Sequence, residues 1–576
     1  GVTVKTENLF NGQSRTASGK RLTVELTANP DWYAVQALPV VGNPSSDDAV
    51  AWATAYYANR LAGVLVEANP AISRVFESWK QSGKDQETLM SNLEKNSDLK
   101  DLLLAETPWV AEAADEAEQK RRIALLFDLN GMSSRLQQAA DKLRTLQLTD
   151  GSWSWYKGMK GSRYITTQTV ELMVRLKAMN ISLPDGMEAQ YGRALGYLRK
   201  EVKKVYEQMC RQEQENNVQV RPDEQIVKYL YICALDETAR KQADKEINTY
   251  FLARLTNRSA ECSIYEKSLL AVIMHACGQK RQAELLLQSV KEYMLATPEM
   301  GRYFDTSKAG YSWNSYKIPT QVAAMEAIWR IAPDQHLLGD MKQWLLKQKQ
   351  VQVWDTPLAT VDAVYAFLGM GGNRLQASGS LKARIGSKTL VTPDDALGYV
   401  RQTYTGADTE VSRIAVVKSG EGLSWGAVYA QYLEDMIRVR PFRTNGLGIV
   451  REYWLGDEQV SASTRLKPGD KLTVRLTVKA NRDMDFVQIK DERASCMEPA
   501  VQLSGYHWNG GIGYYQVNKD ASTEFFIDQM RKGTYVLEYT VYLDRPGTYQ
   551  AGIATIQSAY APEFNGHTDG VELTIE

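Results

Sequence analysis

Residues 151–156 read GSWSWY and residues 165–177 read ITTQTVELMVRLK. An aromatic turn, a threonine and an apolar helix follow one another there, and residues 310–328 and 353–367 repeat that order. A helix on a protein surface needs only one apolar stripe. Because these segments are apolar around most of the helix circumference, we expect each to be covered on two sides. They are predicted to line the inside of a two-layer helical barrel.

Helical periodicity extends from about residue 45 to about residue 368. Candidate helices are 47–66, 223–235, 265–276 and 280–295, the last two joined at Gly278. At about 40 to 50 residues per helical hairpin, a region of this length would hold some six or seven pairs, enough to close a ring. We therefore predict a closed α/α toroid, and an open solenoid is the alternative that the sequence does not exclude.

Alternating apolar and polar residues mark β structure on both sides of this region. Leu22, Val24 and Leu26 alternate with polar residues near the start, and the runs 472–478 and 535–541 do the same near the end. Turn signals separate the later runs at the spacing of a β-sandwich. Since the first strands are too few to bury their own face, we expect them to join strands that follow the helices.

These patterns predict a multidomain protein of mixed α and β class. Residues 1–44 and 369–440 would form one split β domain, and residues 45–368 would form an α/α toroid inserted into it. Residues 441–576 would form a C-terminal β-sandwich.

The composition is that of an ordinary globular protein, with 44% hydrophobic and 24% charged residues among 576. The 68 basic and 69 acidic residues nearly balance, so nucleic acid is not an expected partner. No run reaches the roughly 18 consecutive apolar residues of a membrane helix, so we expect no membrane insertion of this chain. The chain starts at Gly1 without a methionine, which we interpret as a fragment of a longer protein.

The cysteines and histidines give no sign of a metal site. The five cysteines form no CxxC pair or zinc-ligand spacing, and the four histidines lie far apart in the sequence. A small buried hydrophobe is the favoured interpretation of Cys233 and Cys277, which lie in apolar helical stretches. We expect no metal and no cofactor.

Four stretches resemble the bacterial alpha-2-macroglobulin family: NPDWYAVQALP at 29–39, GSWSW at 151–155, WGAVY at 425–429 and YAPE at 560–563. The resemblance implies that the split β domain is CUB-like, the toroid a thioester-type domain and the tail the last macroglobulin-like domain. It also implies a periplasmic or cell-envelope protein, with a lipoprotein anchor in the missing N-terminal part as one option. Such a protein inhibits endopeptidases by enclosing them after they cut a bait segment.

Many members of this family carry a thioester in the pattern Cys, any residue, Glu, Gln just before the first helix of the ring. Aligning this chain on Tyr56-Tyr57-Ala58-Asn59 places Asp48 at the cysteine, Val50 at the glutamate and Ala51 at the glutamine. A chain without this cysteine cannot form the covalent trap, so we expect steric trapping alone. The favoured structural interpretation of Asp48 is an N-cap, and a carboxylate site of unknown purpose is the alternative.

Aromatic residues form two further groups of candidate site residues. The first group would lie at one rim of the ring, either packed between helical hairpins, which we favour, or stacked on a sugar or peptide: Trp153, Trp155, Tyr156 and Trp313. The resemblance to that family implies a second group that would clamp the ring against the C-terminal sandwich, with ordinary strand tyrosines as the alternative: Tyr514, Tyr515 and Tyr560.

The resulting hypothesis is a non-enzymatic protein whose partners are proteases, bound through the full-length parent. One rival is an envelope scaffold that binds peptidoglycan or the proteins of its synthesis. Another is a toroid enzyme of the cyclase or lyase type, which would need an aspartate cluster, zinc ligands or a histidine and tyrosine pair. The helical region holds no Asp-Asp-x-x-Asp or Asp-x-Asp-Asp run, so the enzyme is the least favoured of the three.

Overall fold

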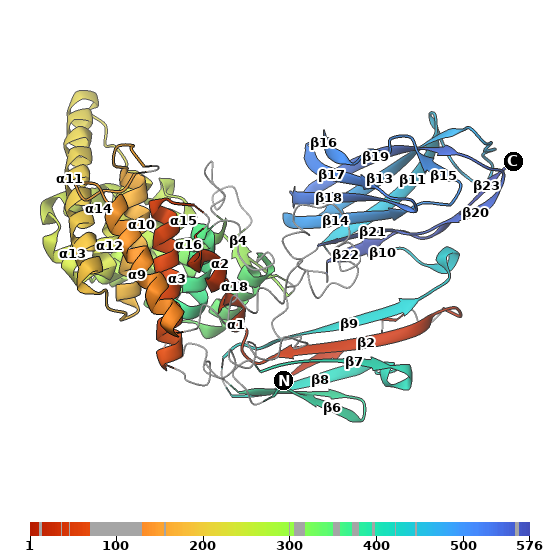
Figure 1. Ribbon diagram of the computed structural model, residues 1–576, viewed down its shortest axis with the longest axis horizontal. Coiled ribbons are helices and arrows are strands. Elements are labelled where there is room, and N and C mark those ends of the chain that lie inside the picture. Colours follow the sequence, from red (N-terminus) through yellow and green to blue (C-terminus); the bar gives the residue numbers. More distant parts are fainter. Residues whose placement is uncertain are drawn as a thin grey trace.

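The computed structural model describes residues 1–7, 9–10, 14–35, 37–44, 46–68, 129–154, 157–298, 300–304, 317–348, 357–370, 379–393, 398–420, 422–443, 446–558 and 564–576. Three parts are visible in Figure 1: a block of helices, a small β unit that contains the N-terminus, and a larger β unit that contains the C-terminus. The predicted mixture of helices and sheets is confirmed.

The small β unit combines strands from both sides of the helical block. Its strands are β1 (Val2–Lys5), β2 (Ser18–Thr27), β5 (Ser380–Ile385), β6 (Lys388–Val391), β7 (Tyr399–Thr405), β8 (Arg413–Ser419) and β9 (Trp425–Leu433). They form sheets in the orders β1-β8-β5-β6 and β7-β2-β9. In the second sheet Leu22 lies opposite Tyr404 on one side and Ala430 on the other. Buried side chains of both sheets, including Leu22 and Ile414, share one hydrophobic cluster. The helices therefore lie between strands of a single β unit in the chain order.

The helical block consists mainly of helices and also contains one short β-hairpin. Its helices are α1 (Trp32–Val35), α2 (Leu38–Gly42), α3 (Ala49–Ala68), α9 (Leu129–Leu146), α10 (Arg163–Ala178), α11 (Asp185–Asn216), α12 (Glu224–Leu235), α13 (Glu237–Gln242), α14 (Lys245–Asn257), α15 (Ile264–Ala276), α16 (Lys280–Lys291), α17 (Lys317–Ile331), α18 (Gln335–Gln348), α19 (Pro357–Val364) and the π-helical turn η3 (Tyr365–Gly369). The helix predicted over 280–295 is wrong at its end. It stops at Lys291, because β3 (Met294–Thr297) pairs with β4 (Gly301–Phe304), whose first residue Gly301 has a φ of 77°.

The most buried helices contact one another in cyclic order. The order runs α3, α10, α12, α15, α17, α19 and back to α3. Helices α9, α11, α16 and α18 contact α3, α10, α15 and α17 respectively. A one-sided apolar stripe on α16, formed by Ala283, Leu286, Leu287 and Val290, fits a position on the outside. The apolar helices are thus buried on several sides, because they contact one another and also contact the outer helices. The closed toroid as such stays a prediction.

The larger β unit contains strands β10 (Phe442–Arg443), β11 (Leu447–Leu455), β12 (Glu458–Gln459), β13 (Lys471–Ala480), β14 (Met484–Glu492), β15 (Met497–Pro499), β16 (Gly505–Asn509), β17 (Ile512–Asn518), β18 (Ser522–Met530), β19 (Gly533–Leu543), β20 (Gly547–Ala551), β21 (Ala554–Ser558), β22 (Asn565–His567) and β23 (Val571–Ile575). Its main sheets have the orders β10-β22-β21-β14-β18-β17-β16 and β12-β11-β13-β19-β15. Along β13 the apolar residues Leu472, Val474, Leu476 and Val478 are buried, as their alternation predicts.

The larger β unit contacts the helical block through α17, α18 and the β3–β4 hairpin. Lys317 at the start of α17 lies 3.8 Å from the Asp483 carboxylate. The Lys347 ammonium lies 5.3 Å from the ring centroid of the buried Phe564, and the Arg482 guanidinium lies 5.1 Å from the same centroid. One aromatic ring thus joins cations from both units.

Candidate functional site

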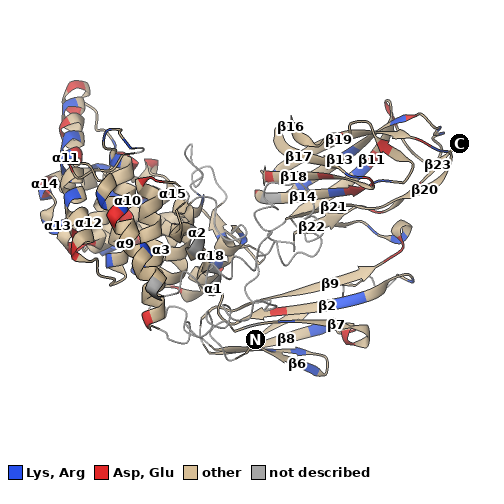
Figure 2. Cartoon of the chain, viewed as in Figure 1, with Lys and Arg blue, Asp and Glu red and all other residues tan. Residues whose placement is uncertain are grey.

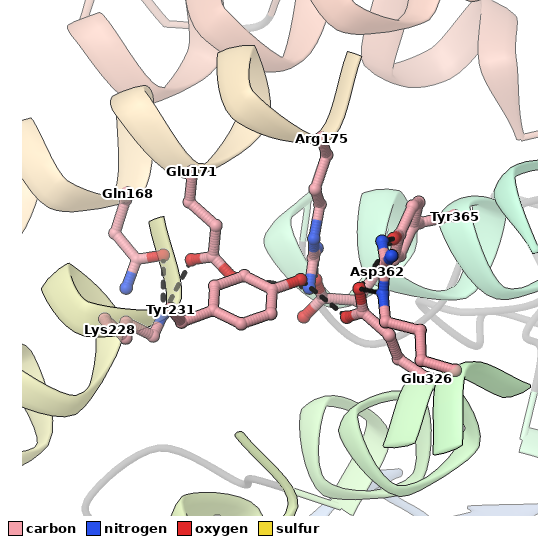
Figure 3. Close-up of polar contacts among 9 residues, drawn as sticks. Gln168, Glu171, Arg175, Lys228, Tyr231, Glu326, Asp362 and Tyr365 are labelled. Atoms are coloured by element: carbon pink, nitrogen blue, oxygen red, sulfur yellow. Dashed lines mark hydrogen bonds and ion pairs between the residues drawn. The ribbon is translucent and has the colours of Figure 1, made fainter. Parts of the chain in front are cut away.

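A cluster of polar side chains lies where the ring helices face one another (Figure 3). We call it the ring-centre network, and its members are Gln168, Glu171 and Arg175 of α10, Lys228 and Tyr231 of α12, Glu326 and Arg330 of α17, Asp362 of α19 and Tyr365 of η3. All are buried except Asp362 and Arg330, which are partly buried. Within each helix these residues are three, four or seven positions apart, so they share one face.

A chain of ion pairs links α12, α10 and α19. The Lys228 ammonium lies 2.9 Å from Glu171 and donates to the amide oxygen of Gln168 at 3.0 Å. Arg175 lies 3.3 Å from Glu171 and also pairs with Asp362. The Arg175 guanidinium lies 4.6 Å from the ring centroid of Tyr365. Positive and negative charges therefore alternate from Lys228 to Asp362.

Glu326 is the acceptor at the other end of the network. Tyr231 donates to it at 2.5 Å, Tyr365 at 2.8 Å and the Arg330 guanidinium at 2.8 Å. Hydrogen bonds from charged and phenolic donors are the strong kind that a buried carboxylate needs. Glu326 thus ties α12, α17 and η3 together.

Burial and mutual charge act against each other in this network. Burial alone would raise the pKa of the Glu171 carboxyl, but the charges of Lys228 and Arg175 outweigh it and lower that pKa. Burial likewise works against the charged forms of Lys228 and Arg175, yet the neighbouring carboxylates raise the pKa of both. At Asp362 burial is the stronger effect and raises the pKa despite Arg175. Burial also raises the pKa of the Tyr231 and Tyr365 phenols, so both stay protonated donors.

The charged groups of the ring-centre network are paired with one another. The charges of Lys228, Arg175 and Arg330 balance those of Glu171, Asp362 and Glu326. A general base or a nucleophile has to present a free lone pair to a substrate. In the part of the chain that the structure describes, no group of three or more His, Cys, Asp or Glu side chains could hold a metal ion. The geometry supports stabilisation of the ring by these groups.

The start of α3 is the position aligned with the thioester. The Asp48 carboxylate accepts a hydrogen bond of 2.9 Å from the backbone N–H of Ala51, and α3 begins at Ala49. This is the geometry of an N-cap. The neighbouring Asp47 accepts from the Trp52 indole at 2.7 Å and lies 3.2 Å from the Lys142 ammonium, which ties α3 to α9. Val50, at the aligned glutamate position, is partly buried in the first turn.

Of the rim aromatics, the structure describes Trp153. Its side chain is fully buried, and its indole N–H donates to the carbonyl of Leu143 at 2.9 Å. Its backbone N–H donates to the Thr166 hydroxyl at 2.9 Å, which joins the aromatic turn to α10. Trp153 therefore packs between α9 and α10. Trp155, Tyr156 and Trp313 lie outside the described residues.

The tyrosines of the larger β unit contact rings of their own sheet. The Tyr514 ring stacks on His507 at 5.6 Å and meets Phe525 edge-on at 5.6 Å. The Tyr515 ring meets Tyr506 at 4.8 Å. Their role as a clamp on the ring stays a prediction. Tyr560 lies outside the described residues.

The sequence did contain a signal for the ring-centre network, which our sequence analysis missed. Single charged residues stand in helical stretches that are otherwise apolar, such as Lys228 in EQIVKYLYICAL and Glu326 in KIPTQVAAMEAIWRI. A charge in such a place needs a buried partner. The partners come from helices far apart in the sequence, and only the fold identifies them.

The described helices include none that is both long and apolar enough to span a membrane.

Comparisons with known proteins find bacterial alpha-2-macroglobulins among the proteins similar to this chain. Residues 446–563 match the model of the bacterial alpha-2-macroglobulin MG10 domain. The alpha-2-macroglobulin homolog of Nostoc sp. is 22% identical over 487 residues, which cover 76% of this chain. This chain spans 23% of that relative's length.

Solved structures of Escherichia coli alpha-2-macroglobulin are also similar to this chain. The native protein from domain MG7 to the C-terminus matches 100% of this chain and 80% of that chain, with 14% identity and a TM-score of 0.36. The form activated by porcine elastase matches 100% of this chain and 45% of that chain, with 14% identity and a TM-score of 0.41.

Proposed function

We propose that this chain, a member of the bacterial alpha-2-macroglobulin family, is the C-terminal part of a macroglobulin that inhibits endopeptidases by steric trapping. In this mechanism the protease cuts a bait segment elsewhere in the protein and is then enclosed. The observation that carries the proposal is the match of residues 446–563 to the bacterial MG10 domain.

The same proposal assigns the domains. Residues 1–44 and 369–440 would form the split CUB-like domain, residues 45–368 an α/α toroid of the thioester type, and residues 441–576 the last macroglobulin-like domain. The pairing of β2 with β7 and β9 supports the split domain. The cyclic contacts from α3 to α19 and back to α3 support the toroid.

Trapping by this protein would be non-covalent. A thioester needs a cysteine at the start of the first ring helix, and Asp48 stands at the aligned position. Its carboxylate caps α3, so the residue has a structural role there. The buried thiols Cys233, Cys262 and Cys496 lie in other elements, and burial raises the pKa of each to about 11. A thiol with so high a pKa is a poor nucleophile at neutral pH.

The proposed protein is an inhibitor and not an enzyme. The pairing within the ring-centre network supports this, because the network's carboxylates and cations bind one another. Proteases are its proposed partners, and a periplasmic or cell-envelope location with a lipoprotein anchor is its proposed setting. An envelope scaffold that binds proteins of peptidoglycan synthesis is the rival hypothesis.

Incubation of the full-length protein with trypsin tests steric trapping. Trypsin should lose activity on a large protein substrate and keep it on a small peptide substrate, because only the small one reaches an enclosed active site. Pretreatment with methylamine should change neither result, since methylamine acts on a thioester. Equal loss on both substrates would indicate an active-site inhibitor, and no loss on either would exclude trapping. Sensitivity to methylamine would contradict the non-covalent mechanism.

A further inference from the structure

Strand β16 forms an open edge of the larger β unit (Figure 1). It is the last strand in its sheet order, with β17 as its neighbour on one side. Four of its five residues are exposed, among them Tyr506 at 67% and Trp508 at 78%. An uncovered edge strand is a template for pairing with a further strand, and proteins usually protect such edges with charges or proline. Protection of this edge, or its lack, therefore indicates whether a further strand pairs there.

The other edges of the two main sheets carry such protection. Strand β10 contains Arg443, and β12 contains Glu458. Strand β15 contains Glu498 and Pro499. Residues 501–518, which include β16 and β17, contain no Asp, Glu, Lys, Arg or Pro, and both strands are tan in Figure 2. Among the described edges of these two sheets, β16 is thus the one without the protection of an edge that stays unpaired.

The turn between β16 and β17 decides which backbone groups of β16 point outward. It consists of Gly510 and Gly511, whose φ values are 59° and 83°, as in a two-residue hairpin turn. The two residues that flank such a turn exchange both backbone hydrogen bonds, and bonded and non-bonded pairs then alternate along the strands. The N–H and C=O groups of Tyr506 and Trp508 therefore point away from β17. No described residue bonds these four groups, so they offer two donors and two acceptors to an added strand.

The charges on neighbouring strands are too far from this edge to select a charged partner. Glu524 and Asp528 lie on the same face as the two exposed rings, but on β18, two strands further in. Neighbouring strands are about 4.8 Å apart, so β18 lies about 10 Å from β16 and about 14 Å from a strand added beside it. At a surface, charges more than about 8 Å apart are largely screened in physiological salt. The complementary partner is therefore an uncharged strand, as β16 itself is.

We propose that β16 pairs with β16 of a second copy of this chain, antiparallel and around a two-fold axis at His507. In this arrangement Tyr506 lies opposite Trp508 of the other copy, so the outward groups of both residues form four hydrogen bonds across the interface. The same pairing brings a phenol and an indole ring together on one face, and aromatic pairs directly opposite each other stabilise antiparallel sheets. Each copy uses the same strand, as a two-fold dimer requires. The interface is separate from the ring-centre network and does not depend on the proposed protease inhibition.

The size of this contact predicts a weak and reversible dimer. A buried aromatic side chain removes about 150–250 Å² from water. Since Tyr506 is 67% exposed and Trp508 is 78% exposed, the four rings of a dimer would bury about 400–700 Å² in total. Stable interfaces bury about 1,200 Å² or more, and smaller ones belong to transient complexes. We therefore expect dissociation constants in the micromolar range.

Sedimentation velocity of the chain over a series of micromolar concentrations tests for the dimer, and substitutions at His507 test its register. Because His507 would lie opposite His507 of the other copy, His507→Lys puts two ammonium groups side by side and His507→Glu puts two carboxylates side by side. Each variant alone should dimerise about fivefold more weakly or worse, since like charges directly opposite each other destabilise a sheet. An equimolar mixture of the two variants should regain dimers, because an ammonium group then lies opposite a carboxylate.

The matched control is Val450→Lys, which adds the same charge at an exposed position of β11, a strand inside its sheet. It should leave the dissociation constant within about twofold of that of the unmodified chain. Circular dichroism should show all three variants folded, since the replaced side chains are exposed.

Three results would overturn the proposal. The first is a chain that stays monomeric throughout the micromolar range. The second is a dimer that His507→Lys leaves unchanged or that Val450→Lys weakens equally. The third is a mixture of the two His507 variants that dimerises no better than either variant alone.

Discussion

The ion pair between Lys228 and Glu171 allows a quantitative prediction of stability. Lys228→Met removes the cation and leaves the Glu171 carboxylate with Arg175 at 3.3 Å. Breaking a buried pair by removing one partner costs about 3–5 kcal/mol, because the remaining charge is uncompensated. Since Arg175 still compensates in part, we expect a loss near the lower end, about 3 kcal/mol in the free energy of unfolding.

A double variant separates the charge effect from the packing effect. Lys228→Met with Glu171→Leu removes both charges and leaves Arg175 paired with Asp362, so the network stays neutral. The double variant should be more stable than Lys228→Met alone by about 1 kcal/mol or more. Unfolding in urea, followed by far-ultraviolet circular dichroism, measures both values.

The matched control for these variants is an exposed pair in the same helical block. Lys241 lies 2.7 Å from Glu237 on α13, and both side chains are mostly exposed. Lys241→Met should cost less than about 0.5 kcal/mol. The reasoning is refuted if Lys228→Met destabilises the chain no more than Lys241→Met does. It is also refuted if the double variant is no more stable than Lys228→Met.

Further predictions concern the helical block. Trp153→Ala should destabilise the chain by about 3–5 kcal/mol, because it leaves a buried cavity and frees the carbonyl of Leu143; a loss below about 1 kcal/mol in urea unfolding would contradict the packing role. Asp48→Ala should cost about 1 kcal/mol through loss of the N-cap, with faster hydrogen exchange in the first turn of α3; unchanged exchange would argue against capping. The hydrogen bond from Arg254 lowers the pKa of Glu213 from 4.5 to about 2, so its stabilising effect should be complete above pH 4.5 and disappear as the pH falls toward 2. The stability difference between the chain and its Glu213→Gln variant measures this, and a difference that persists at pH 2 would refute the assignment.

Local patterns in the sequence were sufficient to predict individual elements. The predicted helix over 223–235 corresponds to α12 (Glu224–Leu235), because Asp223 caps it by accepting from the backbone N–H of Ile226. The predicted helix over 265–276 corresponds to α15, where Ser263 and Glu266 form a capping box. Signals of this kind act over three or four residues, so they can be read without the fold.

Long-range pairing could not be predicted in the same way. The predicted end of the helix over 280–295 was wrong, because Met294–Thr297 forms a strand only when Gly301–Phe304 lies beside it. Lys228 and Glu171 are 57 residues apart, and Arg175 and Asp362 are 187 apart. No periodicity in the sequence connects such pairs. The ring-centre network therefore had to come from the structure, although each of its charges was visible as an interruption of an apolar helix.

The network and the β16 edge differ in what a mutation there should change, and that difference decides whether the ring or the surface carries function. Charges in the ring-centre network are buried and paired, so their loss should lower stability and leave the surfaces of the folded chain intact. His507 is exposed, so its replacement should leave stability unchanged and alter dimer formation. If Lys228→Met and His507→Lys were compared at a temperature where both are folded, only the second should lose the dimer. A loss of the dimer in Lys228→Met as well would mean that the ring centre controls the β16 edge, and the structural interpretation of the network would then fail.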